Sequence, residues 1–125
     1  MDIVSHGLTG LLLARATTSA PRGPVATAVI VGALSPDLDT LATLWDPLAS
    51  IVTHRVATHS LLGGLPLALV AAGVARAAGR DGFWRLAALA YLGLVSHVAL
   101  DVFTPFGTAL LWPADLRRWS VGLST

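Results

Sequence analysis

Four apolar runs divide the sequence, each followed by turn-forming or polar residues. They cover residues 5–20, 25–35, 59–78 and 83–103. Their length and hydrophobicity predict helices, and Thr58 is placed to cap the third one. The stretch 37–57 is more polar and irregular, so it is expected to be a loop. The pattern therefore predicts an all-α fold: a compact antiparallel bundle of about four apolar helices, in a single domain over residues 1–125.

The lengths of these runs and the composition favour a membrane location. The third and fourth runs have about 20 residues each, which is enough to cross a hydrocarbon core of roughly 30 Å. The first two reach only some 17–24 Å and are expected to lie under the headgroups or to span with local thinning. Only 12% of the residues are charged, against about 25% in soluble domains, and the mean hydropathy is +0.73. The lipid bilayer is thus an expected partner, and with a net charge of +1 nucleic acid is not.

Helix alternation places the ionisable residues at one end of this bundle. If the helices run up and down in turn, the first and third begin where the second and fourth end. Those four places hold His6, Asp37, Asp39, His54, His59, His97 and Asp101. All four histidines of the chain are in this set. His97 and Asp101 also share a helix face inside an apolar run, where ionisable residues predict a functional site.

Imidazole and carboxylate groups are ligands for zinc, manganese and iron. Seven such groups exceed the needs of one tetrahedral ion and suit two ions about 3.5–4 Å apart, with Asp37 or Asp39 as the bridge. Zinc is the first expectation, with manganese or iron as alternatives. The chain has no cysteine, which excludes thiolate sites. Taken singly, His6, Asp37, Asp39 and the histidines of 54–59 could equally be ordinary helix-end or loop residues.

Two further residues are placed to support such a site. Arg55, next to His54, suits a phosphate oxygen through paired hydrogen bonds, although an interfacial arginine is the simpler interpretation. Asp2 stands four residues before His6 and is expected to orient that histidine, unless the terminus is disordered. The threonine and serines beside the ligands, Thr58, Ser60 and Ser96, are interpreted as capping or backbone-bonding residues.

Six motifs occur in a characteristic order along nearly the whole chain. They are SHG at 5–7, LSPDLD at 34–39, HRVATHS at 54–60, SHVALD at 96–101, TP at 104–105 and LWP at 111–113. This combination resembles the YdjM-like family, described as membrane-bound metal-dependent hydrolases. It is more distantly similar to the helical domains of zinc-dependent phospholipase C and P1-type nucleases, which carry clustered zinc ligands. The resemblance implies zinc and phosphoester chemistry.

The residues and the resemblance together predict an integral-membrane metal-dependent hydrolase of a prokaryotic cell membrane. Its expected substrate is a phosphoester, with a membrane phospholipid as one candidate, and Asp37, Asp39 and Arg55 are the expected catalytic residues. The alternative is a metal-binding or metal-transporting membrane protein without hydrolysis, which needs ligands near mid-membrane. An intramembrane metalloprotease is a third alternative. The chain has no glutamate, which excludes the His-Glu-x-x-His type but leaves a di-metal peptidase of another type.

The arginines suggest an orientation. Five of them, at 15, 22, 76, 80 and 85, lie at the end away from the site, whereas Arg117 and Arg118 lie at the site end. Because positive residues favour the cytoplasm, the site is expected to face the extracytoplasmic side.

Overall fold

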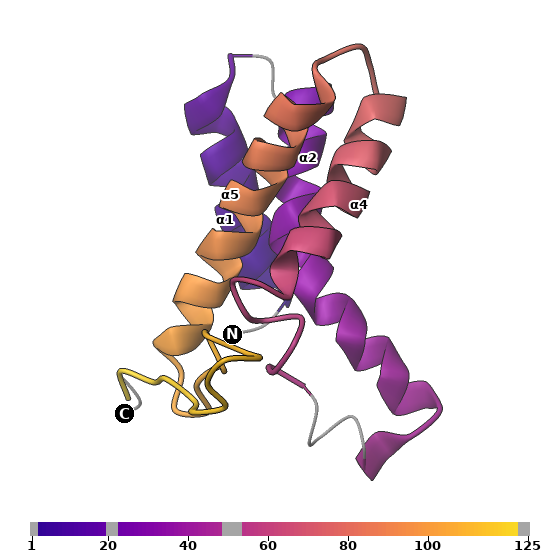
Figure 1. Ribbon diagram of the computed structural model, residues 1–125. Helices are drawn as coiled ribbons and strands as arrows, with labels where there is room; N and C mark the ends of the chain where they lie inside the picture. Colours follow the sequence, from indigo (N-terminus) through magenta and orange to yellow (C-terminus); the bar gives the residue numbers. More distant parts are fainter. Residues whose placement is uncertain (1–2, 20–22, 49–53, 123–125) are drawn as a thin grey trace.

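The computed structural model describes residues 3–19, 23–48 and 54–122. Its elements are α1 (Ile3–Thr17), α2 (Pro24–Leu34), the 3-10 helix η1 (Ser35–Leu44), α4 (Gly64–Ala77) and α5 (Phe83–Val102). The four α-helices form an antiparallel bundle from which η1 projects (Figure 1). Apart from one isolated bridge, the described ranges contain no β-structure. The all-α prediction is confirmed. The break between the first two predicted runs, at residues 21–24, lies partly outside the described residues.

Helices α2 and α5 form the centre of the bundle and pack with their backbones in close contact. A Cβ atom added at Gly93 would lie 2.1 Å from the carbonyl oxygen of Val29, and one at Gly32 would lie 2.0 Å from that of Ala90. The core around them is built mainly of alanine, with Leu86 and Leu94 as its largest buried side chains. Small residues at a helix interface let the helices approach closely, as is typical of membrane bundles.

The stretch 37–57 was expected to be a loop, but its first eight residues belong to η1, which continues α2. The physical reason lies at the junction. In an α-helix the carbonyl of Gly32 would accept a hydrogen bond from residue 36, but Pro36 has no N–H. The hydroxyl of Ser35 donates to that carbonyl instead, at 3.0 Å. The chain therefore remains helical but winds more tightly, with three residues per turn.

The third helix is shorter than predicted, because α4 begins at Gly64 and not near residue 59. The Ser60 hydroxyl donates to the Ala57 carbonyl at 2.8 Å and accepts from the Gly63 N–H at 2.9 Å, which makes a turn. The N–H of Leu61 donates to the Leu110 carbonyl, so a tertiary contact also holds this backbone out of a helix. Thr58 consequently caps no helix.

This shortening changes the membrane prediction. With 14 residues, α4 reaches only about 21 Å. Among the described residues, α5 is the one helix that is both long and apolar enough to cross a membrane. The expectation of two full-length spans is therefore wrong for the third run.

The chain after α5 folds back under the end of the bundle (Figure 1). The N–H of Ala109 donates to the Arg55 carbonyl at 3.1 Å, and the N–H of Val121 donates to the Val102 carbonyl at 2.8 Å. The Tyr91 hydroxyl donates to the Leu61 carbonyl at 3.0 Å. These bonds tie the 54–63 segment between α5 and the C-terminal segment, and so position its two histidines.

Candidate metal centre

The structure brings all seven predicted metal ligands together at one end of the bundle. They come from α1 (His6), η1 (Asp37 and Asp39), the 54–63 segment (His54 and His59) and α5 (His97 and Asp101). Close packing of α2 on α5 aligns η1 with the last turns of α5. Asp2 lies outside the described residues.

Two histidines form the centre of this cluster. The Nε2 atoms of His59 and His97 are 3.1 Å apart. Each lies 3.6–3.7 Å from Oδ1 of Asp37 and 3.4–3.5 Å from Oδ2 of Asp101. Two ligands of one tetrahedral zinc ion lie about 3.3 Å apart, because each is about 2.0–2.1 Å from the metal. The separations between these nitrogens and oxygens therefore fit atoms that share a metal ion.

The tautomer of His97 strengthens this fit. Its Nδ1 is 2.7 Å from the carbonyl oxygen of Ala33, which only accepts hydrogen bonds. In the neutral ring, Nδ1 therefore carries the proton and Nε2 presents a lone pair to His59 and the carboxylates. A backbone carbonyl that fixes a histidine in this way is usual behind metal ligands.

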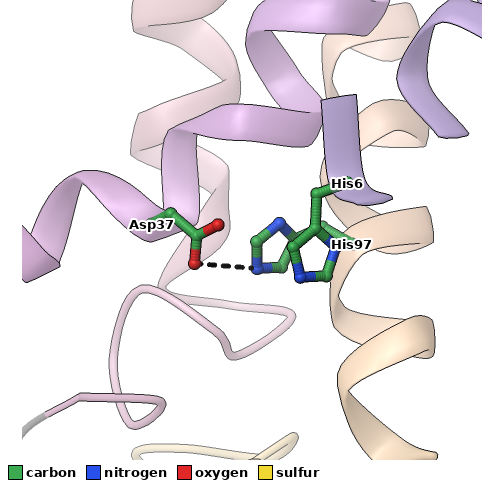
Figure 2. A group of neighbouring side chains, drawn as sticks. All are labelled: His6, Asp37 and His97. Atoms are coloured by element: carbon green, nitrogen blue, oxygen red, sulfur yellow. Dashed lines mark ion pairs between the residues drawn. The ribbon is translucent and has the colours of Figure 1, made fainter. Parts of the chain in front are cut away.

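His6 is fully buried and stacks on His97, with ring centroids 3.6 Å apart (Figure 2). Within the described part of the chain, neither of its ring nitrogens has a hydrogen-bond partner. Its Nε2 is 3.4 Å from Oδ1 of Asp101. Buried polar atoms are nearly always satisfied, so this ring calls for an explanation, and an ion bound to one of its nitrogens would satisfy that nitrogen.

Three groups of side chains in the described residues can each hold an ion. They are His6 with Asp37 and His97, Asp37 with His54 and His59, and His59 with His97 and Asp101. Asp39 belongs to none of these groups. Its Oδ1 instead accepts a hydrogen bond from Nδ1 of His54, at 2.8 Å.

Arg55 lies against the cluster with an uncommon backbone conformation, φ 63°. A positive φ is unfavourable for a residue with a long side chain, so the surrounding contacts must hold it. Its guanidinium donates to the Thr104 hydroxyl at 2.7 Å and lies 3.3 Å from Oδ1 of Asp101. It also lies 5.6 Å from the centre of the Phe106 ring. These contacts direct the charge of Arg55 toward the cluster.

The electrostatics keep the η1 carboxylates ionised. Burial raises the pKa of Asp37 and Asp39, but contacts with the histidines, and for Asp39 also the hydrogen bond from Thr58, outweigh it and hold both pKa values below their usual range. Burial lowers the pKa of His59, but its contacts with Asp37 and Asp39 raise that pKa overall. The carboxylates are therefore charged at neutral pH, which is the form that binds a metal.

Sequence reasoning missed two residues that contact the site. Thr58 was interpreted as a capping or backbone-bonding residue and Thr104 was noted only within the TP motif, yet each hydroxyl bonds a site residue. Their positions in the motifs HRVATHS and TP were the available signal, but spacing alone does not reveal where a hydroxyl points.

Comparison with models of known protein families gives a match over the whole length of the chain. The model of the family described as YdjM inner membrane protein matches residues 1–125. The chain belongs to the YdjM inner membrane protein family. No curated protein and no solved structure matches it. Membership in the YdjM family confirms the resemblance and supports a membrane location. The likeness to zinc-dependent phospholipase C and the hydrolase activity stay predictions.

Proposed function

We propose that this YdjM-family protein binds divalent metal ions, zinc first among them, and hydrolyses a phosphoester at the membrane surface. The observation that carries the proposal is the convergence of His59, His97 and two carboxylates within 3.1–3.7 Å. Among these atoms, Nε2 of the neutral His97 and the carboxylate oxygens are all acceptors, so a cation is the natural occupant.

Two ions can be accommodated without using any histidine twice. His6 and His97 form one group with Asp37, and His54 and His59 form another with the same carboxylate. Asp37 is therefore the side chain best placed to bridge two ions. Asp101 directs Oδ1 toward His6 and Oδ2 toward His59 and His97, so it supports both groups.

Each part of the site has a chemical role in this proposal. Divalent ions held there would supply Lewis acidity and lower the pKa of a water molecule toward about 7. Arg55 would bind and orient a phosphate oxygen. Its guanidinium has five N–H donors, and the contacts to Thr104 and Asp101 leave capacity for an oxyanion. The positive charge would also stabilise the developing charge on the phosphoryl group.

The position of the site along α5 supports a substrate at the membrane surface. The 20 residues of α5 extend about 30 Å, which matches the hydrocarbon core. His97 stands five residues before the last residue of α5, about 7.5 Å from that end. If α5 spans the bilayer, the cluster lies just beneath the headgroups, within reach of a lipid phosphate. The extracytoplasmic orientation stays a prediction.

The outer surface of η1 suggests how this depth is set. Leu38, Leu41 and Leu44 recur every three residues, which aligns them on one face of a 3-10 helix. Their exposed fractions are 57%, 52% and 74%, and Trp45 beyond them is 80% exposed. We call Leu38, Leu41 and Leu44 the leucine stripe. In an inner membrane protein such a stripe is expected to contact acyl chains near the headgroups, where tryptophan is also enriched.

A spin label can measure this contact, since the chain has no native cysteine. We expect a label at Leu41→Cys in lipid vesicles to collide more with oxygen than with chromium oxalate. A label at Thr40→Cys, on a different face of η1, is the matched control and should show the reverse. Equal accessibility at both positions would contradict the membrane contact. Dipolar broadening between labels at Leu41→Cys would indicate a second copy there instead.

The proposed function is tested with protein purified in detergent. Elemental analysis should find up to two zinc ions per chain. A chelator should abolish hydrolysis of phospholipids or generic phosphodiesters, and added zinc should restore it. Arg55→Lys should retain the metal but lose about 10²–10³-fold in turnover, the usual cost of one donor to a developing oxyanion.

Two results would reject this proposal. Protein without bound metal would remove its basis. Bound metal with no hydrolysis, together with metal flux in proteoliposomes, would establish the alternative of a metal transporter.

A further inference from the structure

Asp39 and Thr58 are joined by a short hydrogen bond behind the two histidines of the 54–63 segment. The Thr58 hydroxyl donates to Oδ2 of Asp39 at 2.6 Å. From this contact and the ones described below, we infer that Asp39 and Thr58 are positioning residues that select the metal-binding tautomers of His54 and His59, and that Asp39 is not itself a metal ligand. The inference rests on the proposed metal binding.

The direction of the hydrogen bonds follows from the chemistry of each group. Asp39 is ionised and can only accept, so the single hydroxyl proton of Thr58 is committed to it. The Thr58 oxygen also lies 2.9 Å from Nδ1 of His59. With its proton in use, this oxygen can only accept from that nitrogen. Nδ1 of His59 therefore carries a hydrogen, and Nε2 of the neutral ring presents a lone pair to the cluster.

His54 is held by the other oxygen of the same carboxylate. Oδ1 of Asp39 accepts from Nδ1 of His54 at 2.8 Å, which fixes the same tautomer there. Both oxygens of Asp39 are thus used on the outer side of the histidines. A carboxylate placed behind a metal-binding histidine in this way orients the ring and raises its basicity.

Without Thr58, a competing tautomer of His59 becomes favourable. Its Nε2 is 3.1 Å from Nε2 of His97, which presents a lone pair because its own Nδ1 donates to Ala33. A His59 ring protonated on Nε2 would therefore donate to His97, and both nitrogens would be lost as ligands. The Thr58 oxygen disfavours this His59–His97 hydrogen bond, because it accepts from Nδ1–H of His59 and so stabilises the tautomer that leaves Nε2 unprotonated.

Thr58→Val tests the inference because it removes the hydroxyl and keeps the shape. In metal-free protein, at a pH high enough to keep the His59 ring neutral, ¹⁵N imidazole spectra should show the His59 proton on Nδ1, and Thr58→Val should move it toward Nε2. Zinc affinity should fall about 10–100-fold, as for other partners behind metal ligands. Thr58→Ser keeps the hydroxyl, so its His59 tautomer and its zinc affinity should match those of the wild type. Thr104→Val, which removes a hydroxyl bonded to Arg55, should leave the His59 tautomer unchanged.

A second variant separates positioning from ligation. Asp39→Asn should weaken zinc binding by a similar factor while the number of ions bound at saturation stays the same. A lower number would show that Asp39 is a ligand and would overturn the inference. An unchanged His59 tautomer or an unchanged zinc affinity in Thr58→Val would also overturn it. If the wild-type protein bound no zinc, the proposed function would fail, whereas the tautomer measurement in metal-free protein would still decide the role of Thr58.

Discussion

Replacing Asp101 by asparagine is expected to remove most of the bound zinc. Its Oδ2 lies 3.4–3.5 Å from Nε2 of both central histidines, and its Oδ1 lies 3.3–3.4 Å from Arg55 and His6. An amide keeps the shape but supplies no negative charge to an ion. The loss of affinity should therefore exceed the roughly 10–100-fold typical of a partner behind the ligands. Elemental analysis and calorimetric titration of detergent-purified protein measure it.

The matched control is Asp81→Asn. Asp81 precedes α5 at the opposite end of the bundle, where it forms an exposed ion pair with Arg85 at 2.7 Å. Exposed pairs contribute about 0–1 kcal/mol, so this variant should fold and bind zinc like the wild type. If Asp101→Asn folds and retains its full zinc content, the assignment of Asp101 to the metal centre is wrong.

The second large effect is expected from a single methyl group between α2 and α5. In Gly93→Ala the new Cβ would lie 2.1 Å from the Val29 carbonyl oxygen and 2.9 Å from the Ala33 nitrogen. Both are backbone atoms, so only movement of a helix relieves the clash. Overpacking typically costs about 1–3 kcal/mol and occasionally more, and we expect the upper end of that range. Denaturant unfolding in detergent micelles measures the free energy of unfolding.

Gly73→Ala in α4 is the corresponding control, because nothing lies within 4 Å of its added Cβ. Alanine is the better helix former there by about 0.5–1 kcal/mol, so this variant should be as stable as the wild type or more so. Gly93→Ala should also weaken zinc binding, since Gly93 stands one helical turn before His97 and the clash displaces Ala33, which accepts the His97 hydrogen bond. Equal stability of Gly93→Ala and the wild type would contradict the close helix contact.

The fold was largely predictable because each helix leaves a long apolar signal and the turns carry proline or glycine. The two errors have causes that hydropathy does not register. The hydroxyl of Ser35 compensates for Pro36 and prolongs a helix. The Ser60 turn, together with the bond from Leu61 to Leu110, shortens another, and a contact 49 residues away in sequence is invisible to a local pattern.

The residues that form the cluster could be predicted from the sequence, but the different roles of its two η1 carboxylates could not. Helix alternation alone brings four histidines to one end of the bundle. The roles of Asp37 and Asp39 differ because a 3-10 helix points residues two apart in different directions. One carboxylate therefore enters the ligand groups and the other contacts the Nδ1 side of His54. The positive φ of Arg55 and the hydroxyl of Thr104 that holds its side chain likewise depend on the folded chain.

The cluster takes side chains that are far apart in the sequence, since His6 and Asp101 are 95 positions apart. No fragment that lacks α1 or α5 contains the full set. During synthesis the site is therefore complete only after the last helix has been inserted beside the first. An ion bound by His6, Asp37 and His97 would stabilise the finished bundle and none of the shorter intermediates, because this group needs both α1 and α5. Binding of that ion would therefore favour the last step of assembly in the membrane.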